Sequence, residues 1–228
     1  MPNHLLLHLA VLGVGLALGL HGTGHAARAE TCGSLEPVAL EIQVRAETPE
    51  APRIVAASET EIRRRAFGAG LHDDRPDRRT TGLTATQVEG QAGYRLARAA
   101  LPGRQICLAL RSIEARIANS EVVVYVDRRY AEGSCERAAI LDHELAHVRI
   151  NREALQRGRK SLRARLESAV EPWRGRWVRE SELGTIDAAI GNAVAEGLKA
   201  VRADAARLHA QLDTPESYAR TQRRCAGW

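Results

Sequence analysis

The 228-residue sequence contains 33 Lys and Arg residues against 28 Asp and Glu residues, which gives a formal net charge of +5 at pH 7. Nearly all of the positive charge is carried by arginines that are interleaved with acidic residues, and the sequence has no basic tail. This pattern argues against nucleic acid as a partner, because proteins that bind nucleic acid gather their basic residues on one face or tail.

The first 29 residues have the composition of a secretory signal peptide. Their apolar run, Leu5–Leu20, is followed by Ala27-Arg28-Ala29, the small-residue pattern that signal peptidase recognises. The alternative is a membrane anchor, but the run is short and ends in Gly and His residues. We expect cleavage after Ala29 and a periplasmic or secreted protein that does not span a membrane after processing. The remaining residues, 30–228, are enough for a single domain with a hydrophobic core.

Residues 30–133 are predicted to be rich in strands. The segment 38–44 alternates apolar and polar residues, which is the period of a half-buried strand. Ser58-Glu59-Thr60-Glu61 has the form of a capping box and predicts a short helix, whereas the polar segment 71–82 predicts an exposed loop. Further strands are expected near 93–99, 106–117 and 121–126. We expect these strands to form a small, mainly antiparallel sheet.

The character of the chain changes at residue 134, and residues 134–228 predict two long helices. Ser134 is a suitable N-cap for the first helix, whose apolar residues recur at helical spacing as far as Val170. The second helix repeats apolar residues every three or four positions from Ile186 to Leu212. A helix of that length needs an equally long partner to bury its apolar face, so we expect an antiparallel hairpin. The predicted fold class is therefore α+β, with the small N-terminal sheet followed by this long helical hairpin.

The segment His143-Glu144-Leu145-Ala146-His147 of the first helix has the spacing of a zinc-protease motif. Histidines four positions apart lie about 40° from each other around a helix, one turn above the other, so both imidazoles can bind one metal ion. Glu144 is turned by about 100° from His143, so its carboxylate can contact a water molecule on the metal and act as a general base. The motif predicts that His143 and His147 bind Zn²⁺ and that Glu144 is catalytic. Arg149 departs from the pattern, because this position is usually apolar in such motifs.

Three residues are candidates for the third metal ligand. In an unbroken hairpin, the late part of the second helix lies level with His147, so His209 can point across to it. Asp213, one turn further on, can bind the metal or orient an imidazole through a hydrogen bond. Glu167 follows His147 by the interval found in thermolysin-like proteases, but this option needs a break at Gly158, and the apolar stripe continues through Gly158 without a phase shift. We favour His209, with Asp213 and Glu167 as alternatives.

All four cysteines follow the predicted cleavage site, and an even number of cysteines in an exported protein predicts disulfide bonds. Four cysteines allow three pairings. Cys135 begins the first long helix and Cys225 lies just past the second, so an antiparallel hairpin brings them together. Cys32 and Cys107 then pair near the two strands that they adjoin.

One stretch of the sequence resembles a known family. The segment from Val124-Tyr125-Val126-Asp127 through Ser134-Cys135 to His143–Val148 is similar to a bacterial family of uncharacterised exported proteins that are predicted to be zinc-dependent proteases. The resemblance covers about residues 105–150. It implies a zincin-like site at His143, Glu144 and His147, within the single zincin-like domain that we expect over residues 30–228.

These observations together predict an exported zinc peptidase that acts on peptides or proteins. The alternative is a non-catalytic envelope protein with a structural or vestigial metal site, which binds a partner through its helical hairpin. An open position on the metal with a strand beside it would favour the peptidase, whereas a fourth protein ligand would favour the alternative.

Overall fold

Four strands and four α-helices make up the part of the chain that the structure, a computed structural model, describes: residues 31–68 and 80–228. The strands are β1 (Glu41–Glu47), β2 (Arg53–Ala57), β3 (Gly82–Leu101) and β4 (Gln105–Asp127), and the α-helices are α1 (Glu59–Gly68), α2 (Cys135–Ala169), α3 (Leu183–Leu212) and α4 (Pro215–Gln222). Short 3-10 helices cover Cys32–Ser34, Pro102–Arg104, Glu171–Trp173 and Glu180–Glu182. The predicted signal peptide, 1–29, and most of the predicted loop, 71–82, lie outside the described residues.

The prediction of a mainly antiparallel sheet is wrong, because β1 and β2 both run parallel to the central strand β4. β1 pairs with residues 112–118 of β4, and β2 pairs with residues 123–127. β3 pairs antiparallel with β4 over nearly its whole length, so β1 and β2 must lie one after the other along the opposite edge of β4. The reason is the long connection that leads from the first two strands to β4. α1 and β3 separate β2 from β4 in the chain, and this long crossover allows a parallel pairing, which the alternation of residues cannot reveal.

The strands β3 and β4 form one long hairpin. Two predicted strands, 106–117 and 121–126, are parts of the single strand β4, and β3 begins well before the predicted strand 93–99. The turn between β3 and β4 includes Gly103 and Arg104, which both have positive φ, at 78° and 66°. Glycine adopts this conformation without strain, so its presence favours the reversal at this position.

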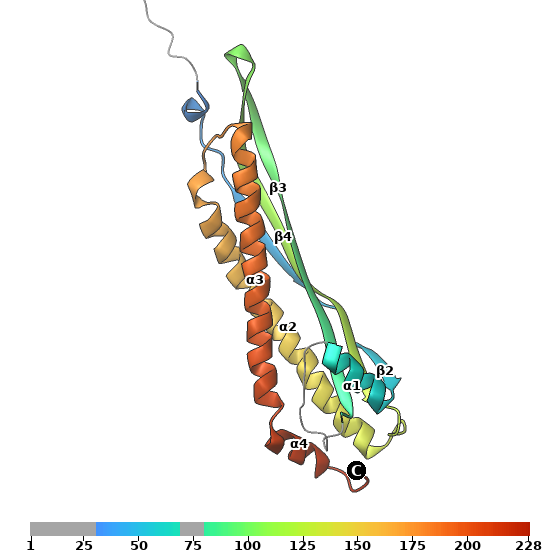
Figure 1. Ribbon diagram of the computed structural model, residues 1–228. Coiled ribbons are helices and arrows are strands. Elements are labelled where there is room, and N and C mark those ends of the chain that lie inside the picture. Colours follow the sequence, from blue (N-terminus) through green and yellow to red (C-terminus); the bar gives the residue numbers. More distant parts are fainter. Residues whose placement is uncertain (1–30, 69–79) are drawn as a thin grey trace, which may run out of the picture. The chain divides into compact units, whose positions relative to one another are not determined.

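The helices α2 and α3 lie side by side, as the predicted antiparallel hairpin (Figure 1). Ser134 caps α2, and its side chain accepts a hydrogen bond from the backbone N–H of Arg137. α2 continues through Gly158, where an added Cβ would lie 2.2 Å from Cγ2 of Val201 on α3. Gly158 therefore permits a close approach of the two helices. This role accounts for a residue that costs a helix about 1 kcal/mol relative to Ala.

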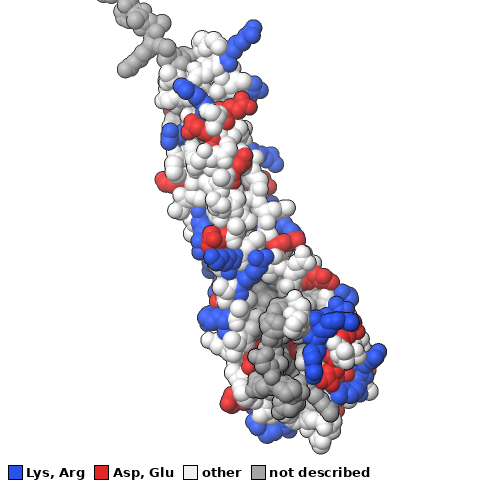
Figure 2. Space-filling view, viewed as in Figure 1, with Lys and Arg blue, Asp and Glu red and all other residues white. Residues whose placement is uncertain are grey.

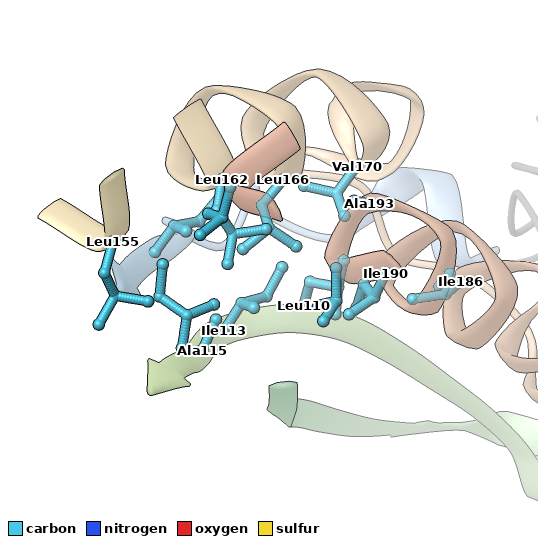
Figure 3. Packing of buried hydrophobic residues seen from close by; sticks show 14 of the residues in the cluster. Leu110, Ile113, Ala115, Leu155, Leu162, Leu166, Val170, Ile186, Ile190 and Ala193 are labelled. Atoms are coloured by element: carbon cyan, nitrogen blue, oxygen red, sulfur yellow. The ribbon is translucent and has the colours of Figure 1, made fainter. Parts of the chain in front are cut away.

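The helical hairpin covers one face of the sheet, and the two layers bury a common apolar core (Figure 3). Its fully buried side chains come from β4, α2 and α3 and include Ile113, Leu155, Leu162, Leu166 and Ile186. Burial of each such side chain stabilises the fold by roughly 1.5–3 kcal/mol. A second cluster packs the first turns of α2 against the valines of β4: Val122, Val124, Val126, Ile140 and Val148. These contacts fix the position of α2 on both sides of the His143–His147 motif.

Both disulfide bonds have the pairing expected from the sequence. Cys32 is bonded to Cys107, which joins the N-terminal segment to β4, and Cys135 is bonded to Cys225, which joins the start of α2 to the segment after α4. The last residues also contact the first turns of α2: Arg224 Nη2 lies 2.7 Å from Asp142 Oδ2. Two disulfide bonds indicate that the protein folds in an oxidising, extracellular type of compartment.

Basic and acidic side chains are intermixed over the face of the molecule in Figure 2. Several form ion pairs on the helical surfaces, such as Arg157 Nε with Asp204 Oδ2 at 2.8 Å and Arg163 Nε with Glu167 Oε1 at 3.0 Å. Exposed pairs of this kind contribute at most about 1 kcal/mol each. Within the residues that are described, no helix is both long enough and apolar enough to cross a membrane.

Candidate metal centre

Two histidines of α2 and one aspartate at the end of α3 bring three possible metal ligands together. His143 and His147 lie one helical turn apart, and their Nε2 atoms are 3.3 Å from each other. Oδ1 of Asp213 lies 3.1 Å from Nε2 of His143 and 3.1 Å from Nε2 of His147. Asp213 is the C-cap of α3, and its backbone N–H donates to the carbonyl oxygen of His209 at 2.8 Å. The end of α3 therefore places the carboxylate opposite the two imidazoles.

The spacing of these atoms fits a tetrahedral metal ion. Zinc binds imidazole nitrogen and carboxylate oxygen at about 2 Å, so two ligands of a tetrahedral zinc lie roughly 3.3 Å apart. The three separations between His143, His147 and Asp213 are 3.1, 3.1 and 3.3 Å. Two histidines and one carboxylate are also a donor set that zinc accepts. The group can therefore hold a metal ion.

His209, the favoured third ligand, lies on the other side of the His147 ring. Its Nδ1 is 2.8 Å from Nδ1 of His147, and the two ring centres are 4.8 Å apart. The Nε2 of His147, which faces His143, instead meets Asp213. The structure thus makes Asp213 the third possible ligand beside His143 and His147. His209 lies on the opposite side of the His147 ring and contacts its Nδ1.

Glu167 is remote from the other candidates. It lies twenty positions after His147 on the unbroken helix α2, which corresponds to about 30 Å at the rise of an α-helix. Its side chain is 42% exposed, and its carboxylate pairs with Arg163. The continuity of α2 through Gly158 therefore separates Glu167 from the motif.

Glu144 is held between α2 and β3 and is only 5% exposed. Its Oε2 lies 2.8 Å from the hydroxyl oxygen of Thr84, which is also 2.9 Å from the Glu144 carbonyl oxygen. Next to it on β3, an added Cβ on Gly82 would lie 2.5 Å from Oε1 of Glu144. Glycine at position 82 and threonine at position 84 therefore form the surface that receives this carboxylate.

Burial raises the pKa of the Glu144 carboxyl. The charge of His147, the hydrogen bond from Thr84 and the charge of His143 act in the opposite direction but do not outweigh it. A buried carboxylate with a raised pKa is a better proton acceptor than an exposed one, which suits a general base.

The pKa values of Asp213, His147 and His209 are shifted from their usual values. Burial alone would raise the pKa of Asp213, but hydrogen bonds with His143 and His147 outweigh it and hold this pKa far below its usual range. Burial alone would lower the pKa of His147, but the hydrogen bond to Asp213 and the nearby Glu144 charge raise it. Burial also lowers the pKa of His209. Below the raised pKa of His147, an ionised Asp213 therefore faces a cationic His147 in the metal-free protein.

Sequence reasoning missed several neighbours of this group. Tyr218 of α4 donates a hydrogen bond to Oδ1 of Asp213 at 2.9 Å, and its ring lies 5.2 Å from that of His143. Thr84 was missed because the sequence pattern placed the strand only from residue 93 onward. Small and hydroxyl residues do occupy every second position here, at Gly82, Thr84 and Thr86. This period of two is a local signal that one face of a strand packs against another element.

Comparisons with known proteins add nothing to this geometry: no family model, no curated protein and no solved structure matches the chain.

Proposed function

We propose that this protein is an exported zinc-dependent peptidase whose zinc is held by His143, His147 and Asp213. The observation that carries the proposal is the spacing of the three ligand atoms, 3.1–3.3 Å apart, with buried Glu144 on the same helix. Three protein ligands are typical of catalytic zinc sites, whereas structural sites usually have four. This number favours the peptidase over a non-catalytic envelope protein with a structural metal site.

The residues of the site divide the chemistry between them. A bound zinc ion would supply Lewis acidity, which lowers the pKa of water towards about 7 and polarises the substrate carbonyl. Glu144 accepts a proton from the attacking water and can return it to the leaving amine. Thr84 orients the Glu144 carboxylate through its hydroxyl group, and Tyr218 orients Asp213 in the same way. The substrate class is peptides or proteins.

Export is part of the proposal. The two disulfide bonds require an oxidising compartment, and the N-terminal residues 1–29 have the pattern of a cleaved signal peptide. We therefore place the protein in the periplasm or outside the cell. The resemblance of residues 105–150 to exported, predicted zinc-dependent proteases agrees with this location.

The proposal is tested by metal analysis of the purified protein and its variants. We expect one zinc per chain, lost in His143→Ala and His147→Ala and weakened in Asp213→Ala. Glu144→Gln should keep the metal and lose hydrolysis of a denatured protein substrate, because only the base is removed. Glu167→Gln is a matched control, since it changes an exposed carboxylate on the same helix and should leave both zinc and hydrolysis unchanged. A double His143→Ala, His147→Ala variant that still binds one equivalent of zinc would overturn the proposal.

A further inference from the structure

Three side chains behind the metal group form a chain of contacts that ends on the sheet. His147 Nδ1 lies 2.8 Å from His209 Nδ1, and His209 Nε2 lies 3.0 Å from Oδ1 of Asn151. Asn151 Nδ2 then donates to the hydroxyl oxygen of Thr86 at 2.9 Å. The chain thus runs from α2 to α3, back to α2 and on to β3. We infer that it keeps a proton on Nδ1 of His147, so that Nε2 is the nitrogen left to bind a metal ion.

The direction of the chain follows from the chemistry of its members. A carbonyl oxygen only accepts hydrogen bonds, so Nε2 of His209 must carry the proton that faces Asn151. In a neutral His209 the other nitrogen, Nδ1, is then an acceptor. The short contact between the two Nδ1 atoms therefore requires the proton to sit on Nδ1 of His147. As a result, Nε2 is the nitrogen of His147 that can give up its proton, and in a neutral His147 its lone pair is directed towards His143 and Asp213.

This arrangement gives His209 a positioning role. The inference rests on the proposed metal site, because a tautomer matters only if Nε2 of His147 binds a metal. With the opposite tautomer, a proton would occupy the position of the metal and would have to be moved before binding. A metal-binding histidine is commonly held by a hydrogen bond to its second nitrogen, and loss of that partner commonly weakens metal binding about 10–100-fold. His209 supplies this partner from α3, and Asn151 and Thr86 hold His209 in turn.

The tautomer is measured directly in protein labelled with ¹⁵N-histidine. Long-range ¹H–¹⁵N correlation spectra distinguish a proton on Nδ1 from one on Nε2, and single histidine substitutions assign the signals. In the metal-free wild type, at a pH at which His147 is neutral, we expect the proton on Nδ1 of His147 and on Nε2 of His209. His209→Leu should shift the His147 proton towards Nε2, and zinc affinity, measured against a chromophoric chelator, should fall about 10–100-fold.

Two further variants separate this role from simple packing. In His209→Gln the side-chain carbonyl can accept from Nδ1 of His147, so the tautomer and most of the zinc affinity should return. Thr86→Val keeps the shape of the strand but removes the acceptor for the Asn151 amino group, so it should produce a smaller shift of the same kind even if His209→Leu does not fold. The inference is overturned if neutral, metal-free wild-type His147 carries its proton on Nε2 and not on Nδ1, or if neither His209→Leu nor Thr86→Val changes the tautomer. Zinc content of the wild type tests the proposed function separately, because the tautomer is read without metal.

Discussion

Asp213 carries the oxygen atom on which both motif histidines converge. Its side chain is 35% exposed, whereas the His143 and His147 side chains are 9% and 11% exposed. Because its pKa is lowered well below 3.8, Asp213 is ionised across the physiological range. The ion pair that it forms with His147 therefore stabilises the fold of the metal-free protein over a limited range of pH.

The sign of this effect follows from the two shifts. The lowered pKa of Asp213 stabilises the fold above about 3.8, and the raised pKa of His147 stabilises it fully below about 6.5. Asp213→Asn should therefore lower the free energy of unfolding of the metal-free protein by about 1 kcal/mol between these values, after allowance for partial exposure. The difference should shrink as the pH rises through the pKa of His147. Urea unfolding of both proteins at pH 5 and pH 8.5 measures it, and an equal difference at the two pH values would contradict the assignment.

Gly82 is the residue of β3 on which the position of Glu144 depends. In Gly82→Ala the new methyl group would meet Oε1 of Glu144 at 2.5 Å and Cγ2 of Ile140 at 2.8 Å. We expect a loss of about 1–3 kcal/mol in unfolding free energy and reduced hydrolysis with zinc retained, because the ligands are not touched. Gly93→Ala on the same strand is the control. An added Cβ there has no described atom within 4 Å, so stability should stay the same or rise slightly.

Among the elements, the helical hairpin decides which residues face the site, and Gly158 sets its spacing. Gly158→Ala would place a methyl group 2.2 Å from Cγ2 of Val201. Although Ala favours a helix by about 1 kcal/mol, the overlap should give a net loss of about 1–3 kcal/mol. The matched control is Gly191→Ala on α3, where the structure shows no described atom within 4 Å of an added Cβ. That change should raise unfolding free energy by up to about 1 kcal/mol, and chemical denaturation compares the two.

At the scale of the whole molecule, the two disulfide bonds lie near opposite ends of the helical hairpin. Cys135–Cys225 lies at the end that carries the metal group and ties down the segment after α4. Cys32–Cys107 lies near the turn between α2 and α3, where Leu108 pairs with Val178. Only the Cys135–Cys225 bond therefore lies at the same end of the hairpin as the candidate metal site.

Removal of each bond should separate stability from metal binding. Replacing Cys135 and Cys225 by Ser should cost about 2–4 kcal/mol and also weaken zinc binding, because Tyr218 of α4 would no longer be held against Asp213. The same change at Cys32 and Cys107 should cost a similar free energy but leave zinc affinity unchanged. Thermal unfolding and chelator competition on both variants provide the comparison. Equal zinc affinities in the two variants would show that the Cys135–Cys225 bond does not support the metal site.

The helical half of the fold could be predicted because its signals are local. The cap at Ser134 and the apolar periodicity from Ile186 to Leu212 each depend on a few consecutive residues. An antiparallel hairpin then follows from the similar lengths of the two helices, and the Cys135–Cys225 bond follows from the hairpin. Strand direction has no comparable signal. β1 and β2 can run parallel to β4 because α1 and β3 intervene in the chain, and nothing local in the strands marks that direction.

The sequence alone determined that His143 and His147 share one helical face, since a spacing of four residues permits nothing else in a helix. The third partner was decided only by the tertiary structure. His209 and Asp213 are one helical turn apart, about 5.4 Å, and this offset is smaller than the uncertainty of a register counted from the hairpin turn. Packing of α3 against α2 and β3 fixes this register. It places the Asp213 carboxylate beside the Nε2 atoms of His143 and His147, and it places His209 beside Nδ1 of His147. The receiving surface of Glu144 was likewise decided by packing, because Gly82 and Thr84 are about 60 residues away in the chain and meet it only where β3 crosses the start of α2.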